Sequence, residues 1–197
     1  MAFINSGRQL SSIMASANCT TGGTRTVVGN RVIHTFLTTG QFVVNDISCI
    51  SGNVIDYLVI AGGGGGNHGG AGAGGFRNSY NNEPSGANSA SESAVTVTQG
   101  ATYDVEVGAG GPGGQIGIAV NGDNSSIIGT GVNIVSFGGG FGGARANSTT
   151  GGTGGSSGGS GNPISNGTNP GTTGTPGQGF GGGSGSMVNW NYGDGGG

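Results

Sequence analysis

The sequence predicts an all-β fold in which a jelly-roll-like β-sandwich continues into a bundle of polyglycine-II-type segments, with essentially no α-helix. Three observations lead to this prediction. Glycine supplies 52 of the 197 residues, against an ordinary usage of about 7%. Several segments have the β-branched, alternating pattern of strands, and no window has the apolar spacing of an amphipathic helix. Three of these predicted strands run directly into glycine.

The first strands are expected in two segments. RVIHTFLTTGQFVV (31–44) is rich in β-branched and aromatic residues, and Gly40 interrupts it. NVIDYLVIA (53–61) is apolar at odd and even positions alike, which predicts a strand buried on both faces.

The clearest strand pattern is AVTVTQGATYDVEV (94–107), in which Val95 and Val97 share one face and residues 99–100 can turn. Its second half alternates, so that Tyr103, Val105 and Val107 should face inward while the acidic residues between them face solvent. Segments 124–129 and 132–137 complete an expected core of five to eight strands.

The glycines recur in runs. Three runs begin where a predicted strand ends (62–66, 108–114 and 138–143), and two others lie at 151–161 and 177–185. Chains extended like polyproline II have three residues per turn and bond only to their neighbours, so side chains must be absent where such chains pack. The glycines expected to be structural are Gly62, Gly63, Gly64, Gly65, Gly66, Gly138, Gly139 and Gly140.

The glycine runs have two other interpretations, a nucleotide-binding loop and a flexible linker. Gly64, Gly66 and Gly69 match a dinucleotide fingerprint, but the residues that follow cannot form the helix it needs. A P-loop requires a lysine, and the chain has none, so no cofactor is expected. A flexible linker is the stronger alternative, because Gly/Ser-rich tracts usually behave as random coil. In the bundle, the isolated Phe76, Phe141, Phe180 and Ile164 should lie at the periphery or cap the bundle.

Charge and motif content argue against several classes of protein. The formal net charge is −3 and only 7% of residues are charged, so no basic patch for nucleic acid is expected. No apolar run approaches the length of a membrane span, and the N-terminus lacks a secretory signal. No catalytic constellation or metal-ligand spacing is recognisable, so an enzyme is not expected.

Individual polar residues have structural interpretations. His34 falls on the inward face of a strand and is expected to be structural, and His68 stands alone among glycines. NGDNSS (121–126) lacks the spacing of a calcium loop and is expected to be a turn. Cys19 and Cys49 are compatible with a disulfide or with two free, buried thiols.

Four segments taken in order resemble the glycine-rich domain of bacteriophage tail fibres and related virion proteins. They are RVIHTFLTTGQFVV, VIDYLVIAGGGGGNHGGAGAGGFR, AVTVTQGATYDVEVGAGGPGG and NGDNSSIIGTGVNIVSFGGGFGG, within residues 31–160. The resemblance implies a virion protein of a tail fibre or capsid surface, oligomeric and used for attachment to a host cell. Members of that family typically close with a short apolar strand, whereas this chain ends NYGDGGG, so a continuation beyond residue 197 is expected.

The organisation expected from this resemblance has three parts. Residues 1–25 would dock onto other virion proteins, 26–145 would form the β-core with its glycine runs, and 146–197 would form a distal Gly/Ser/Thr-rich segment. Loops at the ends of glycine runs are the expected receptor-binding surface. Exposed aromatic residues are the candidates there, namely Tyr80 in 77–91 and Trp190 and Tyr192 in 187–194.

The expected partners are other virion proteins, further copies of the chain in a trimer, and a host surface glycan or outer-membrane protein. A purely structural virion adaptor or decoration protein is the alternative. A secreted glycine-rich or ice-binding protein is a third possibility, disfavoured by the missing signal peptide and the lack of regular threonine arrays.

Overall fold

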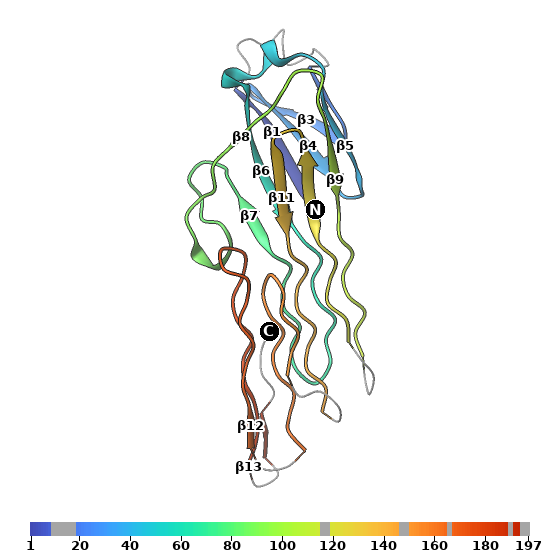
Figure 1. The fold of residues 1–197 in the computed structure, drawn as a ribbon, viewed down its shortest axis with the longest axis vertical. Helices are drawn as coiled ribbons and strands as arrows, with labels where there is room; N and C mark the ends of the chain where they lie inside the picture. Colours follow the sequence, from blue (N-terminus) through green and yellow to red (C-terminus); the bar gives the residue numbers. More distant parts are fainter. Residues whose placement is uncertain (9–18, 115–118, 146–149, 165–166, 189–190, 194–197) are drawn as a thin grey trace.

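The computed structural model describes residues 1–8, 19–114, 119–145, 150–164, 167–188 and 191–193. The molecule is elongated, with a β-sandwich at one end and a set of extended glycine-rich segments that continue from its strands (Figure 1). The helical segments among the described residues are the 3₁₀ turns Ile47–Cys49, Ser51–Asn53 and Gly86–Asn88. The prediction of an all-β fold with essentially no α-helix is therefore confirmed.

Two antiparallel sheets form the sandwich. The first has the order β3-β4-β1-β6-β7, and β8 also pairs with β6. Its strands are β1 (Ala2–Arg8), β3 (Thr24–Val28), β4 (Arg31–Phe36), β6 (Val54–Ile60), β7 (Phe76–Asn78) and β8 (Val95–Thr96). The second has the order β11-β10-β9-β5-β2. Its strands are β2 (Thr20–Thr21), β5 (Gly40–Val44), β9 (Thr102–Glu106), β10 (Ser125–Gly129) and β11 (Val132–Ser136).

The core lies between the two sheets. Alternate residues of β4 and β9 are buried as the sequence predicts, with Tyr103 and Val105 inward and Asp104 and Glu106 exposed. Phe42 of β5 lies opposite Tyr103, and their ring centroids are 6.2 Å apart. Each fully buried side chain of this size contributes about 1.5–3 kcal/mol, so this small core supplies the apolar stabilisation of the fold.

The N-terminal residues belong to the sandwich. Strand β1 lies between β4 and β6, with Ile4 opposite His34 on one side and Tyr57 on the other. The N-terminal ammonium of Met1 donates a hydrogen bond to the carbonyl of Ile60, where β6 passes into glycine. Docking of residues 1–25 onto a virion protein stays a prediction, and any such contact would be made by a segment that is partly integrated into the sheet.

The glycine runs form the bundle predicted from the sequence. We call residues 61–75, 108–114, 119–124, 138–144, 151–161 and 171–185 the glycine bundle. Within it, Ala61 and Gly64 donate to residues 75 and 72, whereas Gly62 and Gly65 donate to residues 123 and 120, at 2.9–3.1 Å. Residues three apart thus bond to the same neighbouring segment, which is the periodicity of polyglycine II.

The same period continues through the rest of the bundle. Amides of Gly139 and Gly142 donate to the carbonyls of Gly62 and Gly65, and Gly140 and Gly143 donate to residues 156 and 159. Residues 157 and 160 in turn donate to residues 180 and 183. The hydrogen bonds therefore cross the domain boundary expected at residue 145, and the flexible-linker interpretation does not describe these segments.

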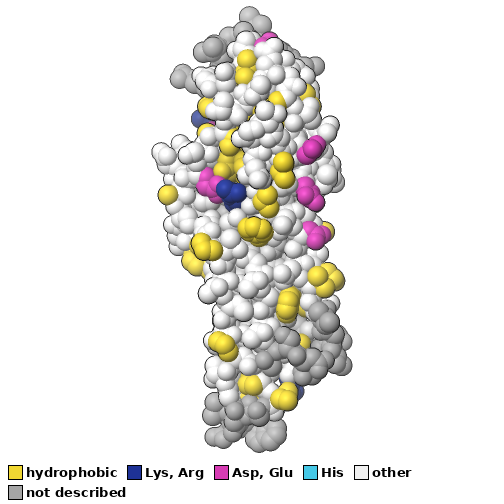
Figure 2. All heavy atoms as spheres, in the orientation of Figure 1, with side chains coloured by type: hydrophobic (Ala, Val, Ile, Leu, Met, Phe, Trp, Pro, Cys, Tyr) yellow, Lys and Arg dark blue, Asp and Glu magenta, His cyan; other side chains and the backbone are white. Residues whose placement is uncertain are grey.

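Side chains lie mainly at the periphery of the bundle. Phe180 and Ile164 are 58% and 73% exposed, and Phe76 and Phe141 are half-buried, as predicted. In the view of Figure 2, hydrophobic side chains are isolated on the bundle and most of its surface is backbone or polar. Strands β12 (Gly167–Asn169), β13 (Gly185–Val188) and β14 (Asn191–Gly193) form a third sheet, with β12 and β13 at the end far from the sandwich (Figure 1).

Candidate functional site

A groove lies on the outer face of the first sheet, and its floor is apolar. Phe3, Ile33 and Leu58 project outward from the neighbouring strands β1, β4 and β6, and Phe3 lies directly opposite Leu58. The cavity has a volume of about 330 Å³. It is also lined by Val28, Arg31, Asp56, Tyr57, Asn78, Tyr80 and Glu83. We call this site the outer groove.

The outer groove explains the apolar pattern of NVIDYLVIA, although the expectation of burial on both faces was wrong. Ile55, Tyr57 and Val59 face the core and are buried, whereas the intervening residues of β6 are only half-buried. The outward face of an antiparallel sheet is usually polar, so an apolar residue such as Leu58 there marks a surface that another group can cover. This is the sequence signal that could have located the groove.

One wall of the outer groove is formed by the segment 79–94. The guanidinium carbon of Arg31 lies 4.9 Å from the centre of the Tyr80 ring, a cation–π contact. The side chain of Asn78 holds this wall, because its Oδ1 accepts from the Tyr80 amide at 3.1 Å and its Nδ2 donates to the Glu83 carbonyl at 3.2 Å. Tyr80 is therefore presented by a hydrogen-bonded turn.

The backbone of this segment is unusual. Asn81, Asn82, Ala87 and Asn88 all have positive φ. Asparagine tolerates this conformation, but for Ala87, with φ of 55°, it is unfavourable. Such conformations persist where the surrounding contacts determine them, so the segment is held in one shape.

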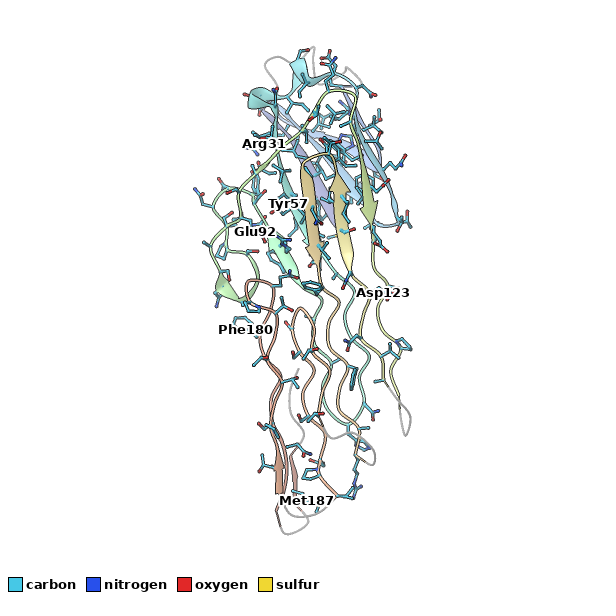
Figure 3. The ribbon with its side chains drawn as sticks, in the orientation of Figure 1. Arg31, Tyr57, Glu92, Asp123, Phe180 and Met187 are labelled. Atoms are coloured by element: carbon cyan, nitrogen blue, oxygen red, sulfur yellow. The ribbon has the colours of Figure 1, made fainter. Side chains whose placement is uncertain are left out.

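A polar cluster fixes the other end of the same segment. Arg77 Nε donates to both oxygens of Glu92, at 2.9 and 3.1 Å, and Arg77 Nη1 donates to the Val135 carbonyl at 3.3 Å. Tyr57 Oη donates to Glu92 Oε2 at 2.7 Å, and Ser85 Oγ donates to Glu92 Oε1 at 3.1 Å. Figure 3 shows Arg31, Tyr57 and Glu92 following one another down the flank of the sandwich.

The cluster perturbs the acidity of its members. Burial alone would raise the pKa of Glu92, but hydrogen bonds from Arg77 and Tyr57 outweigh it and hold that pKa below its usual range. Burial and the hydrogen bond to Glu92 raise the pKa of the Tyr57 phenol. Glu92 is thus the ionised centre of a cluster that joins β6, β7 and β11.

Of the three aromatic residues proposed as a receptor-binding set, the two that the structure describes belong to different parts of the fold. Tyr80 is half-buried in the wall of the outer groove. Tyr192 belongs to β14, where it lies opposite Met187 in the third sheet, and Trp190 lies outside the described residues. The segment 187–194 was expected to be a loop, but its described residues belong to the strand pair β13–β14.

The predicted structural glycines lie inside the glycine bundle. A Cβ added to Gly62, Gly64 or Gly65 would lie 1.9–2.1 Å from a carbonyl oxygen of a neighbouring segment. The same holds for Gly138, Gly139 and Gly140, at 1.7–2.0 Å. Gly63 and Gly66 differ, because the nearest atom is 3.8 Å from the added Cβ of Gly63 and none lies within 4 Å of that of Gly66.

His34 has the structural role predicted for it. Its Nδ1 lies 2.7 Å from the Gly22 carbonyl, which can only accept, so Nδ1 carries the proton. Thr20 Oγ1 then donates to Nε2 at 2.8 Å. Burial lowers the pKa of His34, although its hydrogen bond to Gly22 opposes the shift. His68 is exposed, and the described residues include no group of three potential metal ligands.

The prediction of a turn at NGDNSS (121–126) was wrong. Residues 119–124 are an extended segment of the glycine bundle, and β10 begins at Ser125. Asn121 Oδ1 accepts from the Phe141 amide at 2.8 Å and Asn124 Oδ1 accepts from the Gly138 amide at 2.9 Å. These side chains act as hydrogen-bonding groups of the bundle, which composition alone does not distinguish from turn residues.

Of the two alternatives for the cysteines, the structure has the disulfide. Cys19 is buried and disulfide-bonded, and no free cysteine occurs in the part of the chain that the structure describes. The Cys19 carbonyl also accepts from the amides of Asn45 and Asp46. This position is therefore tied to the end of β5 by backbone contacts as well.

The fold and its glycines define a class of all-β protein in which a sandwich extends into a hydrogen-bonded glycine bundle. The chain belongs to the glycine-rich domain family, whose model matches residues 38–197. Neither the comparison with curated proteins nor the comparison with solved structures found a match. None of the helices among the described residues is long and apolar enough to cross a membrane.

Proposed function

We propose that this chain is a structural protein of a bacteriophage virion, carried on a tail fibre or the capsid surface, that takes part in attachment to the host cell and has no enzymatic activity. The observation that carries the proposal is the glycine bundle. It keeps the sandwich and strands β12 and β13 at opposite ends of an elongated molecule (Figure 1). A backbone-bonded spacer of this kind suits a protein that holds two binding surfaces apart.

The two ends have different roles in this proposal. The sandwich, with residues 1–25, contacts other virion proteins, and the chain assembles as a trimer. The distal hairpin with Tyr192, together with Trp190, contacts a host glycan or outer-membrane protein. Tyr80 adds a second aromatic contact at the sandwich. Aromatic side chains suit this role because they bring large contact area at a low cost in conformational entropy.

Binding of the purified, fluorescently labelled chain to intact bacterial cells tests the proposal. Saturable binding is expected, and it should be lost when Tyr80, Trp190 and Tyr192 are changed to alanine. The matched control is Phe180→Ala, which removes an exposed aromatic side chain of the bundle that the proposal does not use. Equal loss in the control variant would contradict the assignment of these residues.

The second candidate is a virion adaptor or decoration protein that binds no receptor. It is favoured by the state of Tyr80, whose ring already packs against Arg31 and is only half-exposed. A folded chain that binds to no permissive cell, but co-purifies with virion particles, would support this candidate and exclude the first.

A further inference from the structure

Segment 138–143 lies inside the glycine bundle, yet one of its sides has no neighbouring segment among the described residues. A segment with three residues per turn directs its amides in three directions and its carbonyls in three others, so it can bond to six neighbours. Five of these directions carry backbone hydrogen bonds to described segments. The bonding partners lie in 62–65, 69–75, 119–124, 151–155 and 156–159.

The sixth direction is that of the amides of Gly138 and Phe141. These amides donate to the side-chain Oδ1 atoms of Asn124 and Asn121, at 2.9 and 2.8 Å, and not to backbone carbonyls. The two asparagines are three residues apart, as are the two amides, so the side-chain oxygens lie where a sixth segment would place its carbonyls. Beside them is an open space of about 220 Å³, which Thr153 also lines. We call this space the open position.

We propose that the open position binds an extended glycine-rich segment of another protein, whose backbone peptide groups replace the side chains of Asn121 and Asn124. This inference concerns the glycine bundle and does not rest on the proposed role in attachment to a host cell. It assigns the bundle an interaction surface in addition to its role as a spacer.

The side chain of Asn121 shows which groups the bound molecule must offer. Its Oδ1 accepts from the Phe141 amide, and its Nδ2 donates to the Thr153 carbonyl at 2.9 Å. It therefore bridges two walls of the open position as a peptide group would, with an acceptor toward one segment and a donor toward the next. A peptide group that displaces it restores both hydrogen bonds, so the exchange leaves no polar group of the walls unpaired.

The spacing of the two amides selects a polyglycine-II segment over a β-strand. Residues three apart in such a segment are separated by about 9 Å along its axis, at ~3.1 Å per residue. Carbonyls that face one way on a β-strand repeat after two residues, at about 6.6 Å, and would match only one of the two amides. The lining includes Gly122, Gly138 and Gly154, and the absence of side chains at these positions lets another backbone approach closely.

The source of the bound segment follows from the hydrogen bonds of the bundle. Its described segments each bond to neighbours within the same chain. A second copy of the chain would have to open its own bundle to donate one of them, and would lose the hydrogen bonds that hold that segment. The open position is therefore assigned to a different protein, one with a glycine-rich segment that is free to extend.

Titration of the full chain with blocked nonapeptides, followed by NMR chemical shifts, tests the proposal. The probe has three Gly-Gly-Ser repeats, so that its serine side chains share one face that can point to solvent. The control peptide has the same composition, with its serines at unequal spacings. We expect saturable shifts of the Gly138 and Phe141 amides with the probe. The control should bind at least about fivefold more weakly, because a serine side chain must then face a wall.

Two variants of the chain locate the binding. Asn124→Ala should strengthen binding of the probe several-fold, because the probe no longer displaces a hydrogen-bonded side chain from the Gly138 amide. Thr153→Phe should weaken it at least about tenfold, because the larger side chain narrows the open position. Thr173→Phe is the matched control, since Thr173 is an exposed threonine of the bundle outside this lining.

Three results would overturn the proposal. The first is the absence of saturable shifts with the probe, and the second is equal affinity for the probe and the control peptide. The third is binding that Thr153→Phe leaves unchanged. Shifts of the Gly138 and Phe141 amides that grow with the concentration of the chain itself, without any peptide, would overturn the assignment to another protein in favour of a second copy.

Discussion

At the scale of single residues, the glycines of one run are not equivalent. A methyl group on Gly64 would lie 2.1 Å from the Gly140 carbonyl oxygen, while one on Gly66 would meet no atom within 4 Å. We therefore expect Gly64→Ala to lower the free energy of unfolding by about 1–3 kcal/mol or more, because two packed segments must separate. Gly66→Ala should be neutral or stabilising by about 0.4–1 kcal/mol, since it restricts the unfolded chain.

Urea unfolding followed by circular dichroism measures both changes. Gly140→Ala should behave like Gly64→Ala, because its added Cβ would lie 1.9 Å from the Gly152 carbonyl oxygen. Equal stability of the Gly64 and Gly66 variants would contradict the packing of the bundle.

The sequence predicts that glycine is needed in these runs, but it does not predict which glycine faces a neighbour, because that depends on the rotation of each segment.

His34 makes stability depend on pH. Its pKa is lowered in the folded chain from an ordinary value of about 6.5, so the unfolded chain binds more protons in the interval between the two values. The free energy of unfolding should therefore be highest above pH 6.5 and fall as the pH decreases through that value. Urea unfolding between pH 5 and pH 8 measures the effect.

Substitution separates His34 from other titrating groups. His34→Gln should flatten the pH dependence of the free energy of unfolding near pH 6.5, even if it lowers stability at every pH. His68→Gln, which removes the other histidine of the chain, should leave the dependence unchanged. An identical slope in the parent chain and in His34→Gln would exclude this role for His34.

At the scale of elements, the segment 79–94 depends on Glu92. Replacing Glu92 by glutamine removes the ion pair with Arg77 and leaves a partly buried guanidinium without its charged partner. We expect a loss of about 1–3 kcal/mol in the free energy of unfolding, and faster cleavage by protease within 79–94, because this residue joins the segment to Tyr57 and Ser85.

Glu106→Gln provides the control for this change. Like Glu92→Gln, this change removes one negative charge, but Glu106 is exposed on β9. The pKa of Glu92 is lower in the folded chain than its ordinary value. The contribution of Glu92 to the free energy of unfolding should therefore be complete above the pKa that Glu92 has in the unfolded chain. This contribution should disappear as the pH falls through the pKa that Glu92 has in the folded chain. Unchanged protease sensitivity of 79–94 in Glu92→Gln would show that the segment is held by other contacts.

Strongly patterned elements could be predicted from the sequence, and weakly patterned ones could not. The alternation of Tyr103 to Glu106 located β9. The break predicted at Gly40 lies instead at 37–39, and Gly40 is the first residue of β5. The short strands β2, β7 and β12 have two or three residues each, too few for a period to be recognised. The cluster around Glu92 was missed because its members become neighbours only when β6, β7 and β11 assemble.

At the scale of the whole molecule, stabilisation comes from two sources. Apolar side chains between two sheets stabilise the sandwich, whereas backbone hydrogen bonds hold the glycine bundle together. Exposure of apolar surface raises the heat capacity on unfolding, and exposure of polar surface lowers it. Calorimetry should therefore give a heat-capacity change per residue clearly below the usual value of about 12–15 cal/mol/K.

A heat-capacity change within the usual range would contradict this expectation. It would mean that unfolding of this chain exposes as much apolar surface per residue as unfolding of an ordinary globular protein. The matched reference is a β-sandwich of similar length and ordinary glycine content, measured under the same conditions.

The two-part architecture could be predicted from the sequence because strands pass into glycine three times. The outward position of Leu58 could have indicated an apolar patch on this sheet, but the shape of the outer groove could not be predicted, since it needs Phe3 from the N-terminus beside Leu58 and Tyr80.

The three-residue repeat of hydrogen bonds in the glycine bundle constrains how such chains can diverge. Three residues complete one turn of each segment, and Gly62 and Gly65 contact the same neighbours. One inserted residue would rotate the rest of the segment by a third of a turn and direct its amides at the wrong neighbour. Insertions and deletions within the bundle should therefore be tolerated in steps of three, whereas the connections at its ends are free to change by any number.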